Sequence, residues 1–277
     1  MNLISHILRA RGFRLYLANG KRLVDLWQNG GAAVLGHTPA NLLREIKNTA
    51  GRGLYAPLPH FSENRFLKAL SLLFPGRFFR FYAAPPQELS ILTRDTDFLG
   101  LNGLTQIINE GKKNKRLIKL WRPFTNFDSP FKTDNTPLLI PILPGIQTWR
   151  DNLPFGLCVA AAHSEDFLNN FPQSDSLSPI LLSAATRGIY DIIAAKGRVK
   201  ANFPRIMRAL NNSIWRRQGI YLTLKKEPAN DEWTALFQKF LEAGFLLPPI
   251  QTHPLILPGE LSDGEEAKLA AALENSV

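Results

Sequence analysis

Short continuous apolar runs, bounded by Pro or Gly, are the clearest pattern along this chain. Two of them, Leu138–Leu143 and Phe155–Ala162, have no polar alternation, which is typical of strands buried on both faces of an α/β sheet. Shorter runs at Phe78–Tyr82 and Leu117–Trp121 favour two more strands. Between the strands, helix-period apolar stripes with N-terminal Ser or Thr-Pro signals predict helices that begin near residues 38, 62 and 178.

The two ends of the chain have a different pattern. Residues 13–27 alternate apolar and polar side chains around Asn19-Gly20, which predicts a β-hairpin with a tight turn. After residue 197 the pattern predicts a small α+β unit, in which an amphipathic helix at 232–243 ends at Gly244 and a capping box starts the last helix. The order is therefore a hairpin, a large α/β body and a small C-terminal α+β unit.

The composition narrows the class of protein. In 277 residues no apolar run approaches the ~20 needed to span a bilayer, so no membrane partner is expected and we place the chain in the cytoplasm. The single cysteine, Cys158, lies in an apolar run and is read as a buried structural thiol. No metal site is expected, because His37 and His60 lack a second ligand at metal spacing.

The net charge of +10 favours anionic partners only in a general way. The densest basic run contains Lys112, Lys113, Lys115, Arg116, Lys119 and Arg122, with Trp121 beside it. A nucleic-acid patch is one reading of this run. A solvated helix end leading into the strand at 117–121 is the preferred reading, so nucleic acid is not the expected partner.

The join between the predicted strand at 78–82 and the helix that follows reads Ala83-Ala84-Pro85-Pro86. Such a join often holds a phosphate, because the free N–H groups of the helix point outward there. Pro85 and Pro86 have no N–H to donate, and Ala84 has no polar side chain. The sequence therefore predicts a poor phosphate site.

Several segments resemble one family when they are taken in order. RGFRLYLANGKRLVDLWQNGGAAVLGHTPANLLREI (11–46), PFGLCVAAAHSEDF (154–167) and the C-terminal segment from FLEAGFLLPP onward are similar to class III aminotransferases, the fold-type-I pyridoxal phosphate (PLP) enzymes that include glutamate-1-semialdehyde aminomutase. The resemblance implies an α/β fold with a reduced, mostly parallel central sheet and helices on both faces, plus a small α+β domain built from both chain ends. It implies three segments: 1–37, which joins the small domain, 38–196, the shortened large domain, and 197–277, the rest of the small domain.

The departures from the family concern its chemistry. The family's Schiff-base lysine lies seven residues before the proline that aligns with Pro154, and Gln147 stands there. An amide cannot form that imine, and no lysine occurs between Lys132 and Lys196. The family's phosphate cup falls on the degenerate stretch Ala84, Pro85 and Pro86. The chain is also shorter than working members, mainly between about residues 92 and 154.

These departures lead to the functional expectation of a non-catalytic, aminotransferase-like protein that acts as a partner or as a small-anion binder. No PLP is expected, and a homodimer is expected, as in the family, with residues 51–61 at its interface. A candidate ligand cleft is assigned to Trp121, Arg122, Gln147 and Trp149. Two alternatives stay open: a PLP aminotransferase or aminomutase that uses a non-standard lysine, and a basic module that binds nucleic acid or an acidic partner.

Overall fold

The computed structural model describes residues 4–93, 96–101, 104–109, 112–128, 131, 135–150, 152–196, 199, 201–226 and 228–276, with only the backbone at 96–97, 104–109, 112–117 and 212. Its contacts divide the chain into two compact units. One unit comprises Met1–Thr38, Phe124–Asp128 and Gly197–Val277, and the other comprises Pro39–Pro123 and Ser129–Lys196. Among the described residues, no helix is long and apolar enough to cross a membrane.

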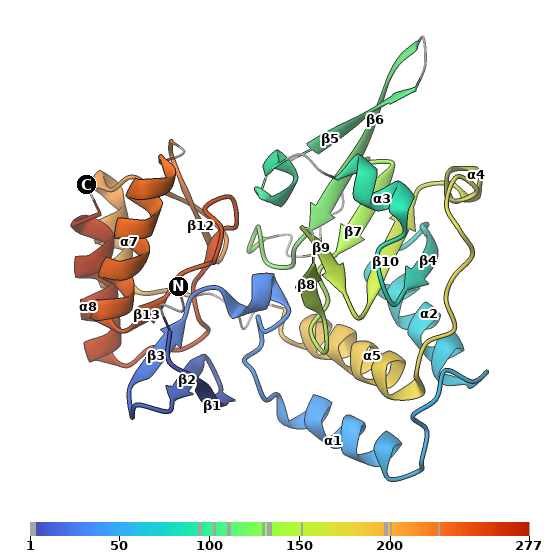
Figure 1. Ribbon diagram of the computed structural model, residues 1–277, viewed down its shortest axis with the longest axis horizontal. Helices are drawn as coiled ribbons and strands as arrows, with labels where there is room; N and C mark the ends of the chain where they lie inside the picture. The colour runs from blue at the N-terminus through green and yellow to red at the C-terminus, as the bar shows by residue number, and fades with distance from the viewer. Residues whose placement is uncertain are drawn as a thin grey trace. The chain divides into compact units, whose positions relative to one another are not determined.

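The second unit, Pro39–Pro123 with Ser129–Lys196, is built on a five-stranded sheet of order β4-β10-β7-β6-β5 (Figure 1). Its strands are β4 (Phe78–Tyr82), β5 (Leu104–Asn109), β6 (Lys112–Trp121), β7 (Leu138–Pro141) and β10 (Cys158–Ala162), and a separate hairpin is formed by β8 (Thr148–Arg150) and β9 (Leu153–Phe155). Its helices are α1 (Ala40–Ala50), α2 (Ser62–Leu73), α3 (Gln87–Leu92), the 3-10 helix η2 (Thr96–Leu99), α4 (Glu165–Leu168) and α5 (Pro179–Ala194).

The sequence-based expectation of a mostly parallel sheet is wrong. Strand β10 runs antiparallel to both β4 and β7, and β5 runs antiparallel to β6. Among the described pairs of this sheet, β6 with β7 is the parallel one. The continuous apolar runs correctly indicated strands buried on both faces, since all of Cys158–Ala162 is buried, but burial on both faces does not encode strand direction.

The apolar run at 155–162 is also two strands instead of one. Gly156 has a φ of +83°, a left-handed conformation that favours glycine, and it separates β9 from β10. The basic run at 112–122 is not a helix end, because Lys112–Trp121 forms strand β6. The side chains of Lys112, Lys113, Lys115 and Arg116 lie outside the described residues, so the nucleic-acid reading of that run is not tested there.

Both faces of this sheet are covered, as the sequence predicts. One face packs against α2 and α5 in a core cluster that includes Phe66, Leu70, Phe81, Trp121, Leu139, Val159, Ala185 and Ile189. On the opposite face, Arg80 and Tyr82 of β4 point away from that cluster, because side chains alternate along a strand. The Arg80 guanidinium and the Tyr82 hydroxyl each donate a 2.9 Å hydrogen bond to the Pro172 carbonyl oxygen, so the segment after α4 covers this face.

The first unit joins the two ends of the chain in one four-stranded sheet, of order β1-β2-β3-β13. The expected hairpin is confirmed, with β2 antiparallel to β3, and β3 pairs in parallel with β13 from the C-terminal part. The elements of this unit are β1 (Ile7–Arg11), β2 (Arg14–Leu17), β3 (Arg22–Asp25), the 3-10 helix η1 (Gln28–Gly31), α6 (Pro204–Ala209), the 3-10 helix η3 (Leu210–Asn212), β11 (Trp215–Gln218), β12 (Tyr221–Leu224), α7 (Asn230–Ala243), β13 (Phe245–Leu246), β14 (Leu255–Ile256) and α8 (Asp263–Glu274).

A salt bridge ties the hairpin to the start of α8. Arg14 donates from Nε and Nη2 to the two carboxylate oxygens of Glu265, at 3.0 and 2.7 Å, which is the bidentate geometry of the stronger Arg–carboxylate pairs. Glu265 also completes the expected capping box with Ser262. The hydrogen bonds from Arg14 are the main reason that the pKa of Glu265 falls from 4.5 to about 2.

We expect this pair to make folding sensitive to acid. A carboxylate whose pKa is depressed in the folded state contributes stability above its unfolded pKa, and the contribution disappears as the pH falls from about 4.5 to about 2. Glu265→Gln keeps an acceptor for the capping box but removes the charge. At pH 7 the free energy of unfolding of the variant should be about 1 kcal/mol lower than that of the parent. The difference should vanish near pH 2, as measured by urea titrations at several pH values. Glu274→Gln, an exposed position on the same helix, is the control; an equal loss at both pH values for Glu265→Gln would contradict the ion-pair account.

Candidate functional site

Gln147 lies where the end of β7 meets the segment that leads into β10. Its side chain is 3% exposed. The Oε1 atom accepts the backbone N–H of Leu143 at 2.7 Å, while Nε2 donates to the carbonyl oxygen of Leu157 at 2.7 Å and, more weakly, to that of Pro141 at 3.4 Å. One amide therefore uses both its acceptor and its donor to connect the backbone after β7 with the backbone before β10.

This geometry defines what position 147 can do chemically. A Schiff base needs a neutral primary amine that a carbonyl compound can reach. Gln147 offers a neutral amide that is buried and engaged in hydrogen bonds at both ends. Gln147 stands at the position that the resemblance assigns to the family's lysine, and its hydrogen bonds are those of a structural side chain.

The strand-to-helix join at Ala83–Pro86 is also occupied by protein groups. The Ala83 N–H donates to Oδ2 of Asp175 at 2.8 Å, and the Ala83 carbonyl oxygen accepts the N–H of Gly156 at 2.8 Å. Pro85 and Pro86 are half-buried and Ala84 is exposed. The first turn of α3 adds the carboxylate Glu88. An incoming phosphate would therefore meet the carboxylates of Asp175 and Glu88, and like charges disfavour its binding.

The four residues assigned to a ligand cleft are mostly inaccessible. Trp121 is 4% exposed and packs edge-to-face on Phe74, with ring centroids 4.7 Å apart, inside the core cluster. Arg122 is 3% exposed and donates from Nη2 to the carbonyl oxygen of Leu99 at 2.8 Å. Trp149 is half-buried in the β8–β9 hairpin. With Gln147 also buried, a ligand could reach at most one of the four side chains in this conformation.

Cys158 and His37 also lie in surroundings that suit structural roles. Cys158 is fully buried in β10, and desolvation raises the pKa of its thiol to about 12, which disfavours the reactive thiolate. His37 lies 2.8 Å from the carboxylate of Asp25, which in turn accepts the N–H groups of Trp27 and Gln28. Among the described residues, no three His, Cys, Asp or Glu side chains are grouped as a metal site would require.

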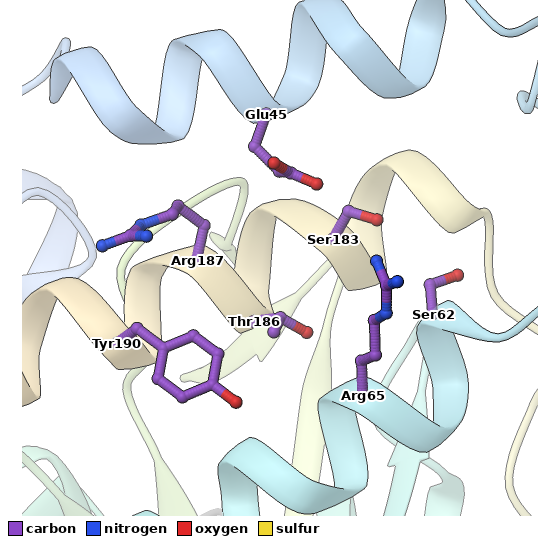
Figure 2. A pocket seen from close by; sticks show the side chains of 7 residues that line it. All are labelled: Glu45, Ser62, Arg65, Ser183, Thr186, Arg187 and Tyr190. Atoms are coloured by element: carbon purple, nitrogen blue, oxygen red, sulfur yellow. The ribbon is translucent and has the colours of Figure 1, made fainter.

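The structure contains a pocket that the sequence reading missed. It lies among helices α1, α2 and α5 of the second unit, has a volume of about 350 Å³ and is shown in Figure 2. Its lining residues are Glu45, Ser62, Arg65, Ser183, Thr186, Arg187 and Tyr190. A signal for part of it was present in the sequence, because Ser183, Thr186, Arg187 and Tyr190 have the i, i+3, i+4, i+7 spacing of one helical face.

Replacing Gln147 tests whether its amide is a structural tie. Gln147→Met keeps the length of the side chain but leaves the Leu143 N–H and the Leu157 carbonyl unpaired in a buried place. We expect the free energy of unfolding to fall by about 2–4 kcal/mol, measured by denaturant titration. Thr148→Ala changes the exposed neighbouring position and should stay within about 0.5 kcal/mol of the parent. A Gln147→Met variant as stable as Thr148→Ala would show that the amide contributes nothing.

Comparisons with known proteins identify relatives of this sequence and solved structures that share its fold. No family model matches the chain. An uncharacterized protein of Treponema pallidum is 27% identical, covering 91% of this chain and 88% of its own, and one of Borreliella burgdorferi is 26% identical, covering 97% and 91%. Among solved structures, a transaminase with PLP bound superposes with a TM-score of 0.66 at 13% identity, covering 98% of this chain and 90% of its own. Ornithine δ-aminotransferase of Plasmodium falciparum gives 0.67 at 11% identity, covering 99% and 92%. This chain therefore has the fold of the PLP-dependent aminotransferases.

Proposed function

We propose that this chain is an aminotransferase-fold protein without PLP catalysis, which acts as a partner protein or as a binder of a small anion. The observation that carries the proposal is the hydrogen bonding of Gln147. At the position where the resemblance places the Schiff-base lysine, the amide is buried and bonded to Leu143 and Leu157. The residues present do not fit PLP at this site.

A second, separate feature supports the same proposal. PLP is also held through its phosphate, and charge-assisted hydrogen bonds of that kind contribute about 1.5–3 kcal/mol each. At the join that would hold the phosphate, the Ala83 N–H is bonded to Asp175, and Pro85 and Pro86 have no N–H to donate. This chain therefore departs from what PLP binding needs at two places that lie far apart in the sequence. They are position 147, for the imine, and residues 83–86, for the phosphate.

The alternative is a PLP-dependent aminotransferase or aminomutase that uses a lysine from elsewhere, and the likeness to a transaminase with PLP bound favours it. Of the two lysines nearest in sequence, Lys132 lies outside the described residues, and Lys196 is exposed just after the end of α5. An imine needs an amine that is held at the cofactor aldehyde, usually in a desolvated place, and the exposed side chain of Lys196 is not desolvated.

Reduction of a mixture of the protein and PLP separates these two functions. Excess PLP is added to the purified protein, borohydride reduces any imine, and peptide mass spectrometry locates the adduct. We expect scattered, substoichiometric labelling of surface lysines and no visible absorbance band of a bound protonated imine. One adduct per chain at a single lysine would overturn the proposal. In that case Lys196→Arg tells whether Lys196 carries it, and an aminotransferase with a known internal imine serves as the positive control.

We propose a second copy of this chain as the partner protein, in a homodimer. The segment between α1 and α2 has three large apolar side chains on its surface, Tyr55 at 63%, Leu58 at 67% and Phe61 at 77% exposure. These three side chains lie close together in sequence, and large exposed apolar side chains of this kind fit the core of a two-fold interface.

Light scattering tests the homodimer directly. At about 10 μM, chosen to lie above the dissociation constant of an ordinary stable dimer, we expect the mass of two chains of 31.1 kDa. Leu58→Ser with Phe61→Ser should weaken the association by about tenfold or more, because both remove apolar area from the interface core. Leu72→Ser, at a position 57% exposed on α2, is the control. A parent protein with the mass of one chain would refute the homodimer.

A further inference from the structure

Helix α5 presents three different faces to its surroundings. Leu182, Ala185 and Ile189 pack into the core cluster beneath the sheet. A second face is set by Gly188, where an added Cβ would lie 2.2 Å from the carbonyl oxygen of Pro144, so the helix meets the loop before Gln147 directly. The third face consists of polar residues. They are Ser183, Thr186, Arg187 and Tyr190.

The polar face of α5 does not simply point into solvent. Helices α1 and α2 both pack against α5, and the space among the three helices is the 350 Å³ pocket. In Figure 2, Glu45 extends into this space from α1 and Arg65 extends into it from α2, with Ser183 of α5 between them. The pocket thus brings one carboxylate and one guanidinium toward each other from opposite walls.

Arg187, the second cation of the pocket, is already neutralised. Its guanidinium donates to Oδ1 of Asp191 from Nε at 3.0 Å and also from Nη2. These hydrogen bonds are the main cause of its raised pKa. Asp191 also accepts from Asn41 at 3.2 Å, which fixes the carboxylate between α1 and α5. Arg187 therefore forms a fixed part of the wall.

Glu45 and Arg65 differ from Arg187 in this respect, although Glu45 lies close enough to Arg187 to be one of the charges that raise its pKa. Within the part of the chain that the structure describes, neither side chain makes a hydrogen bond or an ion pair. The hydroxyls of Ser183 and Tyr190 are likewise without a hydrogen bond there, whereas Thr186 donates to the Leu182 carbonyl oxygen at 2.7 Å and Ser62 pairs with His60. One negative charge, one positive charge and two hydroxyls are thus available to a ligand.

We propose that this pocket binds a small zwitterion, a molecule with an ammonium group at one end and a carboxylate at the other. The ammonium would pair with Glu45 and the carboxylate with Arg65, while Ser183 and Tyr190 supply hydrogen bonds. A simple anion would be repelled by Glu45 and a simple cation by Arg65, so only a ligand with both charges satisfies both walls. A volume of 350 Å³ is at the small end of ligand pockets. The proposal involves neither Gln147 nor PLP and stands apart from the proposed function.

Calorimetric titration with four probes tests the charge requirement. The zwitterions are alanine and γ-aminobutyrate, which differ in the distance between their charges, and the singly charged analogues are butyrate and butylamine. At least one zwitterion should bind with a dissociation constant of about 1 mM or tighter. Butyrate and butylamine should each bind at least about tenfold more weakly, because each lacks one of the two charge pairs.

Two variants make the test sharper, because each should change the specificity as well as the affinity. Glu45→Gln should weaken zwitterion binding by about tenfold and improve the binding of butyrate, since the repelling carboxylate is gone. Arg65→Gln should weaken the zwitterion by a similar factor and improve the binding of butylamine. Lys68→Gln and Glu63→Gln, exposed charges on the same helix α2, should leave every affinity unchanged.

The outcomes that overturn the proposal are equally defined. They are the absence of binding for both zwitterions up to about 10 mM, the binding of butyrate by the parent protein as tightly as γ-aminobutyrate, or equal losses in Lys68→Gln and Arg65→Gln. Circular dichroism of each variant confirms that it is folded. An imine-forming lysine found by borohydride reduction would refute the proposed function and leave this result untouched.

Discussion

One buried amide links two interior strands of the central sheet, at the end where β7 finishes and β10 begins. Gln147 holds the backbone just after β7 and the backbone just before β10 with two 2.7 Å hydrogen bonds. Both partners would otherwise be buried polar groups, which cost about 1–3 kcal/mol each when unpaired. The β8–β9 hairpin, the left-handed Gly156 and the close approach of Pro144 to Gly188 all lie within a few residues of these hydrogen bonds in sequence or in space. The amide therefore fits its surroundings as a structural group.

Much of the fold could be predicted because local signals and burial agree. Asn19-Gly20 marks a hairpin turn, Ser262 with Glu265 forms a capping box, and the run at 158–162 is buried along its whole length. Strand direction could not be predicted in this way. A strand covered on both faces has the same apolar sequence whether its neighbours run parallel or antiparallel to it, and β10 has two antiparallel neighbours.

The candidate site was predictable in part, for a similar reason. The absence of a lysine at position 147 follows from the letters alone, but the reason for glutamine there does not. Its partners are backbone groups of Leu143 and Leu157, and the contacts of a backbone atom leave no trace in residue identity. Trp121 and Arg122 resembled ligand-binding residues in the sequence, and the fold buries both. The pocket beside α5 needs three helices that are separated in sequence, so only its four positions on α5 had a visible periodicity.

Asp175 limits what a single substitution at position 147 could change. Its carboxylate accepts the Ala83 N–H, and its own N–H donates to the Phe81 carbonyl oxygen at 2.9 Å, so it closes the join with bonds of its own. A lysine introduced at position 147 would leave this closure, and the two prolines after it, in place. It would also remove the acceptor of the Leu143 N–H. This substitution alone would thus lower stability without giving a phosphate a place to bind. A single lysine at position 147 is therefore not sufficient to build a cofactor site in this fold.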